Sequence, residues 1–217
     1  MLNTIKKSLK DIFSPMVLKF ILKVGLGSIA IWIALLSYFW TPFSTFIVSY
    51  LTWIPFEWLQ TTVATIAAPL AGYILIIVTI STLTSMYSEG VLIALAKKHY
   101  PHEKVVASPS ITGGIIVTLT STLLFLFLMI ILSPIIFIPI LGQILMLWLS
   151  SILLKAPTVH DVGGLFISDK EELKHKRKKS TLIAMIASLF NYLPVLNIFA
   201  PLFSQIMFLH HILGKNR

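Results

Sequence analysis

Long apolar blocks separated by short polar and basic segments run along this chain. Three of the blocks are nearly continuous, namely Ile29–Leu36, Ile74–Ile80 and Leu123–Leu132. Backbone groups inside a bilayer need partners within the protein, which restricts spanning structures to α-helices and closed barrels. Barrel strands alternate polar and apolar residues, and these blocks do not. The pattern therefore predicts an all-α integral membrane protein.

Two segments are long enough to be transmembrane helices, residues 15–40 and 60–87. Ser14-Pro15 is a typical helix start, because serine is a preferred N-cap and proline is tolerated at the first helical position. A helix over 15–40 would measure about 39 Å at 1.5 Å per residue, more than one hydrocarbon core.

Two further apolar stretches, 109–154 and 180–213, are broken near their middles by prolines and read as helical hairpins. The turn residues are Pro134 and Pro139 in the first hairpin, and Pro194 and Pro201 in the second. Each hairpin either crosses the membrane twice or enters it and returns. The arms of 180–213 are shorter than the about 20 residues needed to cross, which favours a wedge. For 109–154, which begins after Ser108-Pro109, both readings stay open.

The remaining segments are polar or amphipathic. Residues 1–13 place apolar side chains at helical spacing opposite lysines, which favours a helix on an anionic membrane surface; the alternative is a frayed basic terminus. Residues 155–179 form a basic loop, within which Ser168-Asp-Lys-Glu171 reads as a capping box for a short helix.

Charge gives the expected orientation. Residues 41–60 contain no Lys or Arg, and Trp40, Trp53 and Trp58 lie in or next to this segment, whereas basic residues flank both hairpins. By the positive-inside rule, we expect a multi-pass protein of the cell's inner membrane with both termini and the 155–179 loop cytoplasmic. The 57% hydrophobic content and mean hydropathy of +0.92 agree with a membrane class.

Few residues suggest catalysis. The chain has no cysteine, so it has no thiolate nucleophile or Cys-type metal site. His99, His102 and Glu103 lack a fourth ligand, and Pro101 breaks the helix that would align them. His160-Asp161 has no nucleophile beside it. We expect no enzyme activity, catalytic residue, metal, cofactor or nucleic-acid partner.

An anion is the ligand that the sequence favours. Asn197 can cap the returning half of the second hairpin, and half-helix N-termini at membrane depth attract anions. Lys19 and Lys23 lie one turn apart on one helical face, where they could concentrate an anion. The simpler reading is that Asn197 only makes the turn and that the lysines anchor the helix at the headgroups.

The organisation resembles the CysZ-type sulfate permeases and their etoposide-induced-protein relatives. The residues that carry the resemblance are Asp161-Val-Gly163-Gly-Leu165 and Leu193-Pro194-Val-Leu-Asn197-Ile-Phe-Ala-Pro201, with a looser match over 85–98. The resemblance implies a channel-like, homo-oligomeric sulfate carrier that supplies cysteine biosynthesis.

One departure affects the expected substrate site. The family's sulfate site includes a Gly-Leu-Arg motif near the start of the first long helix, where this chain has Pro15-Met-Val-Leu18-Lys19. Lysines at 19 and 23 can supply point charges but not a bidentate fork. The leading hypothesis is a permease for a small inorganic anion, sulfate by resemblance. The alternative is a non-transporting membrane scaffold or assembly protein.

Overall fold

The computed structural model describes residues 1–193 and 196–214, and within those residues the regular structure is entirely helical. Pro194 lies outside the described residues. The main helices, in chain order, are α1 (Leu2–Ile12), α2 (Pro15–Ser49), α3 (Glu57–Tyr87), α4 (Glu89–His99), α5 (Ile111–Ile136), α6 (Leu141–Thr158), α7 (Lys170–Lys179), α8 (Thr181–Ser188) and α9 (Ala200–Leu213).

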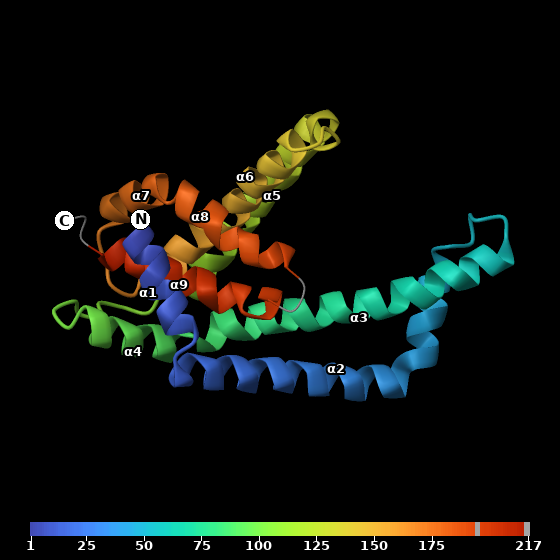
Figure 1. Ribbon diagram of the computed structural model, residues 1–217, viewed down its shortest axis with the longest axis horizontal. Coiled ribbons are helices and arrows are strands. Elements are labelled where there is room, and N and C mark those ends of the chain that lie inside the picture. Colours follow the sequence, from blue (N-terminus) through green and yellow to red (C-terminus); the bar gives the residue numbers. More distant parts are fainter. Residues whose placement is uncertain (194–195, 215–217) are drawn as a thin grey trace.

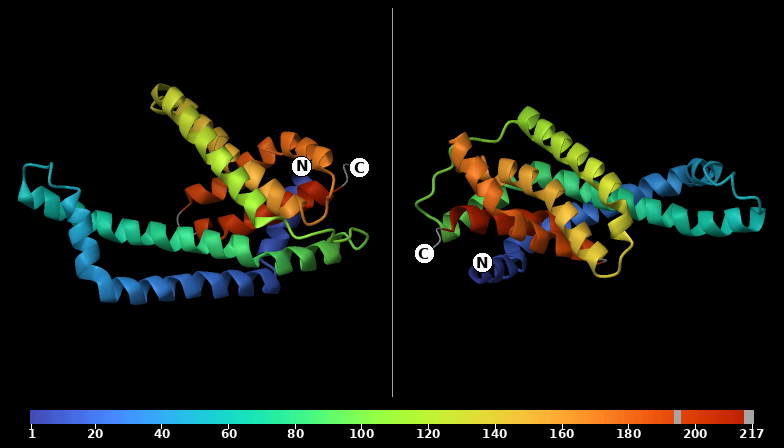
Figure 2. Two further views of the ribbon diagram at one scale, coloured as in Figure 1. Left: turned by 180° about the vertical axis from the view of Figure 1, so that it is seen from behind. Right: turned by 90° about the horizontal axis from the view of Figure 1, so that it is seen from above.

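Two long hairpins project from a base of shorter helices. Helices α2 and α3 form one hairpin and α5 and α6 the other, and their tips point away from the base in different directions (Figures 1 and 2). All four helices are long and apolar enough to cross a membrane, counting α6 together with the π-helical turn that extends it to Gly163. Only 6% of the most apolar window of α5 is buried, so its side chains need an apolar surrounding such as lipid. The prediction of an all-α membrane protein is confirmed.

Helix α2 is longer than predicted. It begins at Pro15 as expected, but it continues past Trp40 to Ser49 and bends where Phe39 leaves helical geometry (φ −103°, ψ 21°). Pro42 explains the bend, since proline donates no backbone hydrogen bond and its ring clashes with the carbonyl four residues earlier. The aromatic and proline-rich segment thus bends the helix rather than ending it.

The start of α5 also differs from the prediction. Ser110, not Ser108, is the N-cap, and its hydroxyl accepts a hydrogen bond from the Gly113 N–H at 3.1 Å. The Ser108 hydroxyl instead donates to a carboxylate oxygen of Glu89 at 3.0 Å. The N-cap of α5 therefore lies two residues after the serine that the Ser108-Pro109 pattern predicted.

The turn between α5 and α6 contains only one of its two predicted prolines. Pro134 lies inside α5, which runs on to Ile136, whereas Pro139 belongs to the short turn before α6. Ile140 ends the turn with φ 68°, a left-handed conformation that is costly for a β-branched residue. At Gly142 an added Cβ would lie 2.0 Å from the carbonyl oxygen of Ile136, so this close approach requires glycine.

Helix α9 forms the centre of the base. Every residue from Ala200 to Leu213 is buried except Pro201, in its first turn, and His211. Helices α1, α3, α4, α6 and α8 pack around it, and the rings of Phe190 and Phe203 stack at 4.0 Å. The two arms of this second hairpin, Thr181–Tyr192 and Ala200–Leu213, are both too short to count as membrane spans.

The segment predicted as a basic loop is largely helical. Residues 155–158 belong to α6, a π-helical turn (Val159–Gly163) follows, and α7 carries most of the basic cluster. Asp169 caps α7, accepting a hydrogen bond from the Glu171 N–H at 3.0 Å, in place of the Ser168 cap that the sequence suggested. Asp169 takes this role because it is the residue with extended backbone before the first helical turn.

Helix α1 docks on α9 by a face that matches the predicted apolar stripe only in part, since Ile5 and Ile12 pack against the core. It is a formed helix, and its buried residues are Ser8, Asp11 and Ile12. Leu2 and Leu9, which the amphipathic pattern also placed on the apolar face, are exposed. The exposed stripe remains available for a membrane surface, and the buried face belongs to the protein.

Candidate anion-binding site

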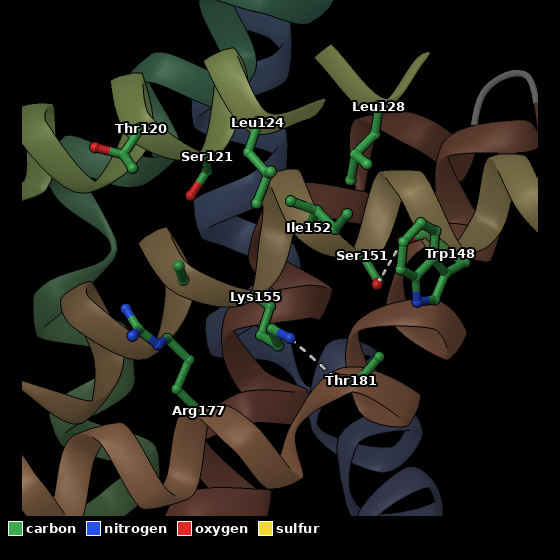
Figure 3. Close-up of a pocket in the computed structure, with 11 residues that line it drawn as sticks. Thr120, Ser121, Leu124, Leu128, Trp148, Ser151, Ile152, Lys155, Arg177 and Thr181 are labelled. Carbon is green, nitrogen blue, oxygen red and sulfur yellow. Dashed lines mark hydrogen bonds between the residues drawn. The ribbon is translucent and has the colours of Figure 1, made fainter. Parts of the chain in front are cut away.

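A cavity of about 460 Å³ lies where the α5–α6 hairpin meets α7 and α8. In Figure 3 the lining residues of α5 lie on one side, those of α6 in the middle, and Arg177 of α7 and Thr181 of α8 on the other side. The polar lining residues are Thr120, Ser121, Ser151, Lys155, Arg177 and Thr181.

Two cationic side chains converge on this cavity. Lys155 comes from the last turn of α6 and Arg177 from the last turn of α7, and both side chains line the cavity (Figure 3). The Lys155 ammonium donates a hydrogen bond to the Thr181 hydroxyl at 3.0 Å. Among residues 1–193 and 196–214, no carboxylate lies within ion-pair distance of either cation. The positive charge in the cavity is therefore not neutralised by an acidic side chain of the described chain.

The remaining lining suits an oxyanion. The Ser121 side chain lies across the cavity from Lys155 and Arg177 (Figure 3), and Leu124 and Ile152 supply an apolar wall. A guanidinium can bind two oxygens of a tetrahedral anion at once, and an ammonium or hydroxyl can bind a third. Apolar walls lower the local dielectric and strengthen such contacts.

The lysines predicted from the sequence lie elsewhere. Lys19 is exposed on α2, and Lys23 borders a separate, largely apolar cavity together with Leu83 and Tyr87 of α3. Neither lysine lines the cavity that holds Lys155.

Asn197 also has a different environment from the one expected. It does not cap α9, whose N-cap is Phe199, but lies in a short 3₁₀ turn, Leu196–Ile198. Its side-chain amide donates a hydrogen bond to the hydroxyl of Tyr73 on α3. The structure therefore does not gather the three residues predicted for the anion into one cavity.

The sequence does contain a signal for Lys155 and Arg177, since both belong to the basic flanks from which we inferred the topology, and the run that holds Arg177 also suits a mouth that collects anions. Lys155 is the one charged residue in the apolar stretch 111–159, and such isolated charges next to membrane segments are often functional. Arg177 was indistinguishable from the other basic residues of its run, because only the fold shows which of them turns toward α6.

The His160–Asp161 pair has a structural setting. The two side chains are 3.2 Å apart, and Asp161 accepts a hydrogen bond from the Ser85 hydroxyl at 3.4 Å. An added Cβ on Gly113 would lie 2.8 Å from the His160 ring, so the pair packs tightly against the start of α5. These contacts join the π-helical turn to α3 and α5.

Comparison with known proteins identifies one family. Residues 4–201 match the model of the family described as Sulfate transporter CysZ/Etoposide-induced protein 2.4. No curated protein and no solved structure matches the chain significantly.

Proposed function

The chain belongs to the Sulfate transporter CysZ/Etoposide-induced protein 2.4 family, and we propose that it is a permease for a small oxyanion, with sulfate as the leading substrate. The observation that carries this proposal is the convergence of Lys155 and Arg177, without a carboxylate partner in the described chain, on a cavity at the base of a membrane hairpin. Two positive charges match the double negative charge of sulfate, and the family description supports that choice.

The cavity would act as a binding station on the permeation path. The unpaired cations raise the local concentration of anions, and their hydrogen bonds replace part of the hydration shell. The contact between Lys155 and Thr181 holds the ammonium in place before the anion arrives. Because part of the wall consists of leucine and isoleucine side chains, the cavity does not surround the anion with polar groups, and the anion can leave again.

The cellular setting is part of the same proposal. Basic residues gather on α1, α4 and α7, which all lie in the base, whereas both hairpin tips point away from it (Figure 1). This distribution supports a cytoplasmic base with both termini inside, in the inner membrane. The exposed apolar faces of the hairpins support assembly of several copies, and sulfate entering the cytoplasm would feed cysteine biosynthesis.

Radiolabelled sulfate uptake into proteoliposomes tests the proposal, with empty vesicles as control. Lys155→Gln and Arg177→Gln should each lower uptake about 10- to 100-fold, the loss expected for one charge-assisted hydrogen bond. Lys178→Gln is the matched control, because Lys178 lies next to Arg177 on the same helix and is exposed like it, but does not line the cavity. Arg177→Lys should recover part of the uptake, since it restores charge but not the fork.

The outcomes separate the site from the activity. Uptake by the unmodified protein at the rate of empty vesicles would favour the scaffold alternative. Rapid uptake that survives both Gln substitutions would keep the permease and reject this cavity as its binding site.

A further inference from the structure

Three side chains from distant parts of the chain meet where α1 docks on the base. The Asp11 carboxylate lies 2.8 Å from Nε2 of His210 and 2.8 Å from Nε2 of His99, both measured to Oδ2. One potential ligand atom from each residue falls within 4.8 Å of the other two. The histidine rings are perpendicular neighbours, with centroids 5.1 Å apart.

The cluster is sheltered from solvent. The side chains of Asp11 and His210 are 1% and 0% exposed, and that of His99 is 20% exposed. Carboxylate oxygens and imidazole nitrogens are common ligand atoms of transition metals.

Neighbouring groups orient these three side chains from behind. The Tyr100 hydroxyl lies 3.0 Å from Nδ1 of His210, and Nε2–H of His210 can donate to Oδ2 of Asp11. A bound metal would take the place of that Nε2 proton, and Nδ1–H would then donate to the Tyr100 oxygen. Lys98 donates to Oδ1 of Asp11 at 3.2 Å, so both histidines face the other carboxylate oxygen, Oδ2. Metal-binding histidines and carboxylates are commonly held in this way by outer hydrogen bonds.

We propose that Asp11, His99 and His210 form a binding site for a divalent transition metal, with Zn²⁺ the best fit. Two imidazoles and one carboxylate are a frequent zinc ligand set, with a fourth position left for water. Tetrahedral zinc needs ligand atoms about 3.3 Å apart, so each of the two carboxylate–imidazole distances of 2.8 Å would open by about 0.5 Å. Hard cations such as Mg²⁺ prefer oxygen ligands and fit poorly.

A metal here would fasten three separate elements. Asp11 lies at the end of α1, His99 at the end of α4 and His210 near the end of α9. Ion binding to the folded form alone would add to its stability. This site is distinct from the cavity that holds Lys155, so the test of metal binding does not depend on the proposed transport.

The test uses purified full-length protein without a histidine tag, stripped with a chelator and titrated with ZnCl₂. We expect one Zn²⁺ per chain by elemental analysis, and a melting temperature raised by about 5–10 °C at free zinc about 100 times Kd. His99→Gln should weaken binding more than about 100-fold, beyond the effect of losing an outer hydrogen bond. His102→Gln is the matched control, because His102 is exposed three residues away.

His99→Gln is chosen because the Lys98 and His210 contacts to Asp11 remain, so the variant keeps the docking of α1; a single sharp size-exclusion peak checks this. Co²⁺ provides a second probe, since its visible absorption reports tetrahedral N/O ligation. Absence of a 1:1 zinc complex in the unmodified protein would overturn the proposal. Equal zinc affinity in His99→Gln and the unmodified protein would overturn it as well.

Discussion

The side-chain amide of Asn197 donates a hydrogen bond to the hydroxyl of Tyr73, which lies near the middle of α3. The turn of the 180–213 hairpin is thereby tied to the central part of a helix long enough to span the membrane. Irregular backbone at such a depth has to be covered by protein or water. The contact supplies part of that cover, and it makes the wedge interpretation testable.

Tyr73→Phe should destabilise this turn. The Asn197 amide would lose its acceptor, at a cost of about 1 kcal/mol, between the values typical of soluble and membrane hydrogen bonds. Thermal melting in detergent measures the effect. Tyr192→Phe is the control, because the Tyr192 hydroxyl contacts the Ser150 hydroxyl at 3.3 Å in an exposed position. An equal loss of stability in both variants would contradict a special role for Asn197.

The depth of the turn can be measured with a cysteine at Asn197, since the chain has no native cysteine. If the 180–213 hairpin is a wedge, a bulky impermeant thiol reagent added outside should not label this position. A small reagent that does label it, with protection by sulfate, would connect the turn to a water-filled path. Free labelling by the bulky reagent would mean that the hairpin crosses completely.

The orientation has its own labelling experiment. Cysteines at Ser44 or Thr52, near the tip of the α2–α3 hairpin, should react with an impermeant reagent from outside intact cells. Cysteines at Lys104 or Lys174, in the base, should react only after the membrane is permeabilised. The opposite pattern would reverse the predicted topology.

The lysines of α2 provide a comparison for the proposed anion cavity. Because Lys19 is exposed and Lys23 borders an apolar cavity, the Lys19→Ala/Lys23→Ala double variant should lower sulfate uptake by less than Lys155→Gln does. Initial uptake rates, corrected for the amount of reconstituted protein, measure this. A larger loss in the double variant would move the binding site to the first long helix.

Much of the architecture could be read from the hydrophobic pattern. Apolar blocks of this length have few stable forms in lipid, so an all-helical fold with several long apolar helices follows directly. The exact ends of the helices were harder to predict, because several residues that could cap a helix lie within a few positions of one another. Ser108 and Ser110 both precede the α5 hairpin, and only backbone geometry decides that Ser110 is the cap.

The candidate sites were harder to predict from the sequence, because each brings together residues that are far apart along the chain. Asp11 meets His99 and His210 across 88 and 199 positions. Sequence spacing relates His99 only to its neighbours His102 and Glu103. Such spacing reveals ligands on one helix, but not ligands that tertiary packing brings together. Arg177 could not be separated from its basic neighbours for the same reason.

Gly142→Ala should disrupt the α5–α6 hairpin. The added methyl group would lie 2.0 Å from the carbonyl oxygen of Ile136, so the turn has to move, at a cost of about 1–3 kcal/mol or more. Gly27→Ala is the control, because a Cβ there meets nothing within 4 Å and alanine favours the helix. Melting temperatures of the two variants should shift in opposite directions, and an unchanged Gly142→Ala protein would contradict the geometry of the turn.

The docking of α1 on α9 has a consequence for how the protein is made. At about 5–20 residues per second, His210 is synthesised about 10–40 s after Asp11. During that interval the hairpins can enter the membrane while the Asp11 carboxylate has no His210 to pair with. A chain that ends before α9 would lack the helix on which α1 docks. Cellular proteases that recognise loose N-terminal segments could therefore distinguish such a fragment from a finished molecule.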